Sequence, residues 1–141
     1  MFVLNATDVR KDWGRFIDTL VREKPQFVKR SRDTIFAASL DTLVEIVKPY
    51  KFTVALYTEE DGSITASLNE VDIAVNGKNQ DEVLASLSEN LIEYAEEYYS
   101  NYNLYAASPN RKSHLPYILN VLIQKNTEKV RDLIVCQAGE N

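Results

Sequence analysis

The N-terminal part of the chain starts with a short β-type run and continues as a helical pattern. Residues 2–4 favour a strand, Thr7 is the predicted N-cap of the helix, and Pro25 ends it. The apolar positions recur at spacings of three and four, as on one face of an α-helix: Val9, Trp13, Phe16, Ile17, Leu20 and Val21. The pattern predicts one amphipathic helix after a strand.

Two further β-type runs and a second helical pattern come next. Residues 26–31 and 34–39 are predicted to pair as a hairpin around residues 32–33. Ser39 is the predicted N-cap of the second helix, and Pro49 closes it. The apolar stripe of this helix consists of Leu40, Leu43, Val44 and Val47. The first block is therefore predicted to have the order β-α-β-β-α.

The pattern then changes to a strand-rich segment. Residues 53–58 and 63–68 fit two strands joined by an acidic turn that contains Gly62. Residues 71–75 are predicted to add a third strand, and Asn76-Gly77 is a strong turn signal.

A long amphipathic helix follows this segment. Asn79 or Gln80 lies near its N-cap, and acidic residues occupy its first turn, where the helix dipole favours them. Its predicted apolar stripe consists of Leu84, Leu87, Leu91, Ala95, Tyr98 and Tyr102. The glutamates of the helix lie mostly off this stripe.

The C-terminal segment is less regular. Residues 100–113 are predicted to form a polar loop, and Ser113 to cap a helix that tolerates Pro116 in its first turn. The apolar positions of that helix are Leu115, Ile118, Leu119 and Leu122. Asn126 is predicted to end it, and residues 127–135 fit either a further helix or a strand.

These elements predict an α+β fold in two parts. Residues 1–50 form the β-α-β-β-α block, and residues 51–141 form a small antiparallel sheet with helices. The hydrophobic content of 45% is sufficient for a core. A block of about 50 residues buries little apolar surface by itself, so we expect the first part to form a homodimer.

Charge is distributed unevenly along the chain. Residues 1–51 contain ten Lys and Arg against seven Asp and Glu, residues 52–105 one against eleven, and residues 106–141 five against three. The net charges are +3, −10 and +2, and the whole chain carries −5. Such a chain can present one basic face to phosphate while the remainder repels it. The alternative is that the acidic excess is only the solvated face of a helix.

Residues that usually carry catalysis or bind metals are scarce. The one histidine, His114, and the one cysteine, Cys136, could in principle form a nucleophilic pair, but we expect Cys136 in the core and His114 at the surface or in a cap. They do not suffice for a structural zinc site, and the four glycines form no phosphate-binding loop. We predict a protein that is not an enzyme and has no metal or cofactor.

The sequence has no feature of a membrane or secreted protein. No apolar run approaches the ~18 residues of a membrane span, and the N-terminus lacks the basic-then-apolar pattern of a signal peptide. A single cysteine excludes an internal disulfide. We expect a cytoplasmic protein without membrane contact.

An ordered series of short motifs runs through residues 3–46. They are Asn5-Ala6-Thr7 at the helix start, Arg10, Pro25, Val28-Lys29-Arg30, the second hairpin strand at 35–38, and Ser39-Leu40-Asp41. In this order the motifs resemble the N-terminal domain of the Phd/YefM family of antitoxins. The chain departs from the family in having no glycine in the hairpin turn and in having Leu43 where the family tends to have an aromatic residue.

The resemblance implies a dimer that binds operator DNA. It carries Arg10 and Arg30 over as DNA-contacting residues, because arginine makes bidentate contacts with bases and phosphates. Lys11 and Arg32 are added because they are adjacent in the sequence. Without the resemblance, all four would be interpreted as ordinary exposed charges.

The second block has a weaker resemblance. The strand at 53–57, Asp61-Gly62, Gly77 and Asp81-Glu82-Val83 are similar to the small HicB-like antitoxin domain. The chain departs from that family at residues 68–72, where a Pro-Asp-Leu-Pro-Gly stretch is usual. The alternative is an ordinary α+β module.

Tyrosines are concentrated at the end of the acidic helix. The predicted toxin-binding residues are Tyr94, Tyr98, Tyr99 and Tyr102, with Tyr105 nearby. Tyrosine is favoured in interfaces because it buries a large area and keeps a polar tip. Toxins that cleave RNA are typically basic, and an acidic surface complements them. The alternative is that about half of these tyrosines pack in the core.

The resulting hypothesis is the antitoxin of a type II toxin–antitoxin system. It would neutralise a basic, RNase-type toxin through residues after 50 and repress its own operon by binding operator DNA as a homodimer. The alternative function is a free-standing dimeric transcription regulator with a small effector-binding C-terminal domain.

Overall fold

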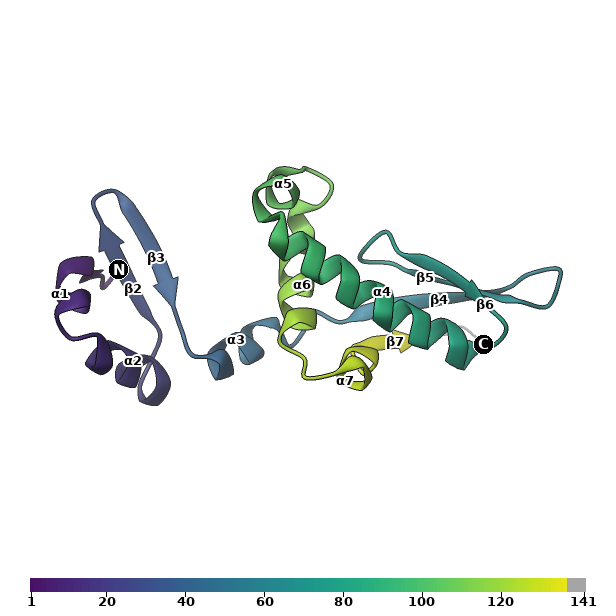
Figure 1. Cartoon of the computed structure of the whole chain (residues 1–141), viewed down its shortest axis with the longest axis horizontal. Coiled ribbons are helices and arrows are strands. Elements are labelled where there is room, and N and C mark those ends of the chain that lie inside the picture. The colour runs from purple at the N-terminus through teal and green to yellow at the C-terminus, as the bar shows by residue number, and fades with distance from the viewer. Residues whose placement is uncertain (137–141) are drawn as a thin grey trace. The chain divides into compact units, whose positions relative to one another are not determined.

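The chain forms two compact units, Met1–Ile46 (unit 1) and the part that begins at Val47 (unit 2). The computed structural model describes residues 1–136, and Figure 1 shows the order of their helices and strands. Each unit combines helices with a β-sheet, so the predicted α+β class is confirmed. The sequence placed the division after residue 50, whereas it falls between Ile46 and Val47.

Unit 1 is built on a three-stranded sheet in the order β1-β2-β3. β1 (Leu4–Asn5) runs parallel to β2 (Gln26–Arg30), and β2 pairs antiparallel with β3 (Asp33–Ala37). β1 is shorter and later than predicted, and the N-cap after it is Asn5 instead of Thr7. The Oδ1 atom of Asn5 accepts a hydrogen bond from the backbone N–H of Thr7 at 3.0 Å.

The single helix predicted after β1 is two helices, α1 (Ala6–Lys11) and α2 (Trp13–Arg22). Asp12 separates them with φ −140° and ψ 73°. Its carboxylate accepts a hydrogen bond from the backbone N–H of Arg15 at 3.2 Å and so caps α2. The apolar periodicity continues across this break, which is why the pattern predicted one helix.

The core of unit 1 is small. Phe16 and Leu20 of α2 pack against Val28 of β2, with a few partly buried apolar residues around them. Trp13 and Val21, which belong to the predicted apolar stripe, stay 60% and 58% exposed. The stripe is therefore only half covered within one chain.

The β2–β3 turn begins one residue earlier than predicted. Arg30 pairs with Asp33, so Ser31 and Arg32 form the turn. Ser31 has φ 55°, a left-handed conformation that costs a non-glycine residue about 1–2 kcal/mol. The missing glycine at this turn is thus replaced by a strained serine.

A short helix, α3 (Leu40–Val47), ends unit 1 and leads into unit 2. The predicted N-cap is confirmed, because the Oγ atom of Ser39 accepts a hydrogen bond from the backbone N–H of Thr42 at 3.3 Å. Val47 is 1% exposed, whereas Leu40 is 61% exposed.

Unit 2 contains a four-stranded sheet in the order β6-β5-β4-β7. β4 (Phe52–Thr58) pairs antiparallel with β5 (Ile64–Leu68), which pairs antiparallel with β6 (Ala74–Gly77). β7 (Ile134–Cys136) lies parallel to β4, so the predicted antiparallel sheet is a mixed one. A local sequence pattern cannot predict this pairing, because the connection from β6 to β7 runs through several helices.

The third strand is displaced relative to the prediction. It begins at Ala74, and Asn76-Gly77 is part of it instead of forming a turn. Gly77 packs closely against α4: a Cβ atom there would lie 3.0 Å from Cγ1 of Val83, closer than an ordinary van der Waals contact.

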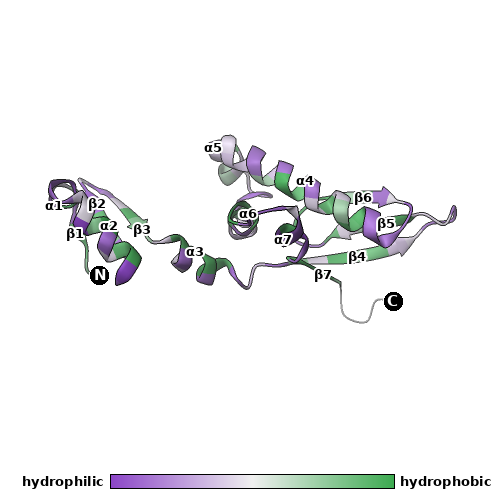
Figure 2. Cartoon of the chain, turned by 60° about the horizontal axis from the view of Figure 1, so that its bottom comes forward, coloured by the Kyte–Doolittle hydropathy of each residue, from purple (hydrophilic) through white to green (hydrophobic). Residues whose placement is uncertain are grey.

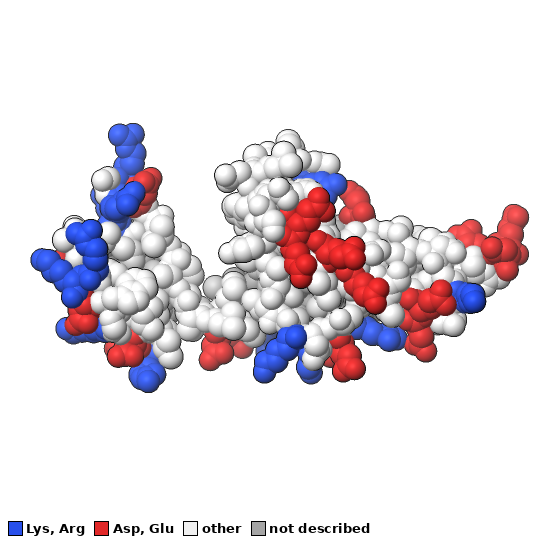
Figure 3. Space-filling view, viewed as in Figure 1, with Lys and Arg blue, Asp and Glu red and all other residues white. Residues whose placement is uncertain are grey.

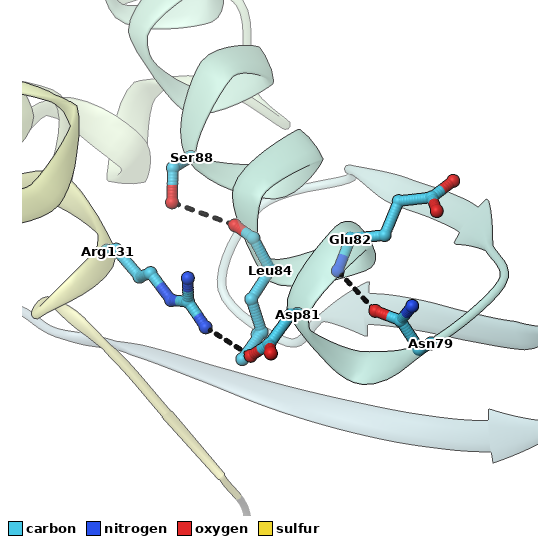
Figure 4. A network of polar contacts seen from close by, with 6 residues as sticks. All are labelled: Asn79, Asp81, Glu82, Leu84, Ser88 and Arg131. Carbon is cyan, nitrogen blue, oxygen red and sulfur yellow. Dashed lines mark hydrogen bonds and ion pairs between the residues drawn. The ribbon is translucent and has the colours of Figure 1, made fainter.

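The longest helix is α4 (Gln80–Ser100), and of the two predicted cap positions, Asn79 and Gln80, it is Asn79 that caps it. The side chain of Asn79 accepts a hydrogen bond from the N–H of Glu82 at 2.9 Å (Figure 4). The same figure shows the ion pair of 2.9 Å that joins Asp81 to Arg131 of α7 (Thr127–Arg131).

The segment after α4 is more helical than predicted. The predicted polar loop contains α5 (Tyr102–Ala107), and a 3₁₀ turn, η1 (Lys112–His114), precedes α6 (Leu115–Leu122). Ser113 lies inside η1 and does not cap α6, whereas Pro116 does fall in the first turn. Asn126 caps α7 instead of ending α6, and residues 127–135 contain both a helix and the start of β7.

The main core lies in unit 2, between the sheet and helices α4, α6 and α7. Figure 2 shows the apolar residues of α4 along the side that faces the sheet. The fully buried positions of this core include Phe52, Val54, Val83, Leu87, Leu91, Tyr98, Ile118 and Val130. The predicted stripe of α4 is confirmed at Leu87, Leu91, Ala95 and Tyr98.

Candidate functional site

The four predicted DNA-binding residues lie on two neighbouring parts of unit 1. Arg10 and Lys11 occupy the last turn of α1, Arg30 ends β2, and Arg32 lies in the β2–β3 turn. All four are exposed, and α1 packs against β2. Figure 3 shows basic side chains over α1 and at the end of the hairpin. Within residues 1–136 none of the four forms an ion pair, so their charges are not neutralised by the chain itself.

Unit 1 also has an uncovered apolar surface. The helices cover the sheet face that carries Val28, while Phe27 and Phe36 lie on the opposite face with their ring centroids 5.3 Å apart. Phe27 is 37% exposed and Phe36 50% exposed. Phe36 also lines a groove of about 430 Å³ with residues of α3 and the segment before it: Ala38, Ser39, Leu40, Leu43 and Ile46. We call Phe27, Phe36 and this groove the open face of unit 1.

The predicted tyrosine surface of unit 2 needs one correction. Tyr98 is 0% exposed and belongs to the core, so it is withdrawn from the predicted toxin-binding residues. Its hydroxyl donates a hydrogen bond to the backbone oxygen of Arg111 at 3.0 Å, and burial raises its pKa. Tyr99 and Tyr102 are 66% and 42% exposed, so they remain available to a partner. Tyr98 and Tyr99 belong to the last turns of α4, whereas Tyr102 begins α5.

Tyr94 is partly buried in a cluster of rings and hydrogen bonds. Its hydroxyl lies 2.7 Å from Nδ1 of His114, and its ring is edge-on to those of Tyr98 and Tyr105. The guanidinium of Arg111 lies 5.4 Å from the ring centroid of Tyr94.

His114 and Cys136 are placed in the opposite way to the prediction. His114 is 6% exposed, whereas Cys136 is exposed on β7. The imidazole lies edge-on to the ring of Tyr94 with centroids 5.9 Å apart, and the hydroxyl of Tyr94 is its polar partner. The histidine is thus a structural residue of unit 2.

The burial of His114 predicts a dependence of stability on pH. Burial, and secondarily the charge of Arg111, lowers the pKa of His114 below 6.5, while Asp72 opposes this. Protons then bind the unfolded chain more tightly, so the stabilisation is complete above pH 6.5 and is lost as pH falls through the lowered pKa. The free energy of unfolding can be measured in urea between about pH 5.5 and 7.5, above the carboxylate range. It should change less with pH for His114→Gln than for the wild-type chain. The same change with pH in both proteins would contradict this role.

Beside this cluster, unit 2 has an acidic cleft of about 410 Å³. Asp72, Glu93 and Glu97 supply its carboxylates, and Tyr94, Tyr105 and Arg111 are also part of its lining. Figure 3 shows acidic side chains in a row over α4. Sequence reasoning identified the acidic helix but missed Asp72 and Arg111, which reach the cleft from other segments.

The described residues form neither a metal site nor a membrane-spanning helix. Residues 1–136 contain no group of three or more His, Cys, Asp or Glu side chains that could hold a metal ion. In the same part of the chain, no helix is long and apolar enough to cross a membrane.

A basic surface in one unit and an acidic, aromatic-rich surface in the other are typical of a protein that binds macromolecules. A family model described as antitoxin of toxin–antitoxin, RelE/RelB, TA system matches residues 1–136. The chain therefore belongs to this family of antitoxins, which indicates a regulatory protein with a toxin as its partner.

One solved structure supports the same assignment. It is a crystal structure from Syntrophomonas wolfei subsp. wolfei, described as the antitoxin part of a proposed toxin–antitoxin system. It is similar to this chain with a TM-score of 0.91 and 37% sequence identity, over 97% of this chain and 99% of that chain. No curated protein matches the chain.

Proposed function

We propose that the chain is a type II antitoxin that neutralises a basic, RNase-type toxin with unit 2 and represses its own operon by binding operator DNA with unit 1. The main observation that supports this proposal is the separation of acidic and basic charge between the two units. Residues 52–105 have a net charge of −10, whereas the exposed cations Arg10, Lys11, Arg30 and Arg32 belong to unit 1. One chain can then bind a basic protein and a polyanion on separate surfaces.

The resemblances found in the sequence support the two roles. Residues 3–46 resemble the Phd/YefM DNA-binding domain, and residues 53–83 are similar to a HicB-like domain. Family membership favours an antitoxin over a free-standing regulator with an effector-binding domain, because the family description includes a toxin partner. The proposed site of action is the cytoplasm, where the operator DNA is accessible.

The DNA-binding role predicts that Arg10→Ala and Arg30→Ala each weaken binding to the chain's own promoter fragment. Loss of one good arginine contact costs about 1–3 kcal/mol, and wild-type affinity should fall steeply with salt because bound counterions are released. Fluorescence anisotropy at several salt concentrations measures both effects. Lys125→Ala, which removes an exposed cation of unit 2, is the matched control. Unchanged promoter affinity in both arginine variants would exclude these residues from the interface.

The open face of unit 1 predicts a homodimer. A sheet with one bare apolar face and a core of three buried residues gains stability when a second layer covers it. Light scattering should give about twice the monomer mass of 16.1 kDa. Phe36→Lys should shift the chain toward monomer, because it places a charge in the proposed interface.

The control for the dimer is Tyr57→Lys. Tyr57 is 54% exposed on β4 of unit 2, so the substitution introduces the same charge at a similarly exposed aromatic residue outside the open face. A wild-type chain that stays monomeric at high concentration, or equal effects of both substitutions, would argue against a dimer through the open face.

A further inference from the structure

The acidic cleft of unit 2 is formed by segments that are far apart in the sequence. Asp72 precedes β6, Glu93 and Glu97 project from α4, and Tyr105 belongs to α5. Its volume of about 410 Å³ is within the range of ligand-binding pockets. Asp72, Glu93 and Glu97 are exposed, so a partner can reach them.

The cleft already accommodates one guanidinium group. The Cζ atom of Arg111 lies 5.4 Å from the ring centroid of Tyr94 and 5.3 Å from that of Tyr105. These are cation–π distances. The interaction with the Tyr94 side chain, and more weakly the charge of Asp72, raises the pKa of Arg111. The walls of the cleft are therefore chemically suited to a planar cation.

The carboxylates outnumber the cation that the chain supplies. Glu97 accepts a hydrogen bond from the hydroxyl of Tyr105 at 2.8 Å. Asp72 and Glu93 form no ion pair within residues 1–136, where the one ion pair is Asp81–Arg131. With Arg111 counted, the three carboxylates leave the cleft with two uncompensated negative charges.

A metal ion does not fit this arrangement. The described part of the chain has no group of three acidic, histidine or cysteine side chains close enough to hold one. A guanidinium group is larger and donates several hydrogen bonds in one plane, so it can reach carboxylates that a single ion cannot bridge. It also stacks on tyrosine rings, as Arg111 does here.

We propose that this cleft binds an arginine side chain of the toxin, with Asp72 and Glu93 accepting its hydrogen bonds. The inference rests on the proposed function for the identity of the partner. Charge complementarity selects the occupant: residues 52–105 carry a net charge of −10, and the partner that this surface fits is a basic protein. Arg111 and the arginine of the partner would then share the carboxylates of the cleft.

Peptide titration of the full chain, followed by backbone amide NMR shifts, tests the cleft without the toxin. The probe is acetyl-Arg-Gly-Arg-amide, and the control is the same peptide with neutral citrulline in place of arginine. We expect shifts around residues 72 and 90–97, and binding of the citrulline peptide about tenfold weaker, because it lacks the charge that strengthens these hydrogen bonds.

Asp72→Asn and Glu93→Gln should each weaken the binding of the arginine peptide about threefold, as expected for the loss of a partly exposed ion pair. Glu45→Gln, an exposed acidic residue of α3, is the matched control and should bind like wild type. Glu97 is not used, because its substitution also removes the hydrogen bond to Tyr105. Urea unfolding should show wild-type stability for Asp72→Asn and Glu93→Gln.

Equal binding of the two peptides, or wild-type affinity in both variants, would overturn the inference. Spermidine is titrated in parallel, and binding of spermidine much tighter than that of the peptide would also overturn it in favour of a free polyamine. Co-purification of the protein encoded beside this chain with the tagged wild type tests the proposed function separately. If the neighbouring protein co-purifies with Asp72→Asn and Glu93→Gln as well as with wild type, the result contradicts only the arginine-binding role of the cleft. If it does not co-purify with wild type, the result contradicts the proposed function.

Discussion

Replacing Tyr98 by alanine is expected to lower the free energy of unfolding of unit 2 by about 3–5 kcal/mol. Tyr98 is 0% exposed, packs in the main core, and has its ring stacked on that of Tyr105 with centroids 5.3 Å apart. Its removal leaves a cavity and deprives the backbone oxygen of Arg111 of a hydrogen bond. Urea unfolding followed by circular dichroism measures the loss.

Two variants separate packing from the other roles of the tyrosines. Tyr98→Phe keeps the ring and should cost only about 0.5–1.5 kcal/mol, the net value of one hydrogen bond. Tyr99→Ala removes a tyrosine that is 66% exposed and should change stability little. Trp13, the one tryptophan, lies in unit 1, so its fluorescence is an internal reference for that unit. Equal losses for Tyr98→Ala and Tyr99→Ala would contradict the assignment of Tyr98 to the core.

Asn120→Asp is expected to be as damaging, at about 3–5 kcal/mol. Asn120 is 3% exposed, and its Nδ2 donates to the backbone oxygens of Val47 at 3.2 Å and Tyr50 at 2.8 Å. Aspartate at this position would bury a carboxylate against two carbonyl oxygens that had been accepting hydrogen bonds. The segment that starts unit 2 would lose its attachment to α6.

Asn126→Asp is the matched control, because it makes the same chemical change at an exposed position. Asn126 caps α7 by accepting a hydrogen bond from the N–H of Lys129 at 2.9 Å, and aspartate accepts this bond equally well. Thermal unfolding should show a large decrease in Tm for Asn120→Asp and little change for Asn126→Asp. Similar Tm values for the two variants would show that the buried donor is dispensable.

Local signals in the sequence predicted the elements that depend on neighbouring residues. The stripe of α4, the caps at Asn79 and Ser39, and the two strands β4 and β5 depend on periodicity, side-chain capping and turn chemistry, all of which are local. The break at Asp12 was missed because a cap can interrupt a helix without interrupting its apolar pattern. β7 was left undecided because its pairing with β4 joins segments about eighty residues apart.

The candidate surfaces were predictable only in part for the same reason. Charge counts along the sequence located the acidic segment, and spacing placed Tyr98 and Tyr102 on one stripe. Spacing could not show that α4 ends at Ser100, which leaves Tyr102 partly exposed while Tyr98 is buried. The cleft itself combines Asp72, α4 and Arg111, and only the folded chain brings these together.

The proposed function requires that unit 2 of this chain neutralise a toxin independently of DNA binding by unit 1. The direct measurement is growth of cells that express the toxin gene beside this chain, with the antitoxin supplied from a separate inducible promoter. Wild type and the double variant Arg10→Ala/Arg30→Ala should both restore growth, whereas Glu89→Lys/Glu93→Lys/Glu96→Lys on α4 should not. Failure of the wild-type chain to restore growth, or full rescue by the α4 charge-reversal variant, would contradict toxin neutralisation by the acidic surface of unit 2.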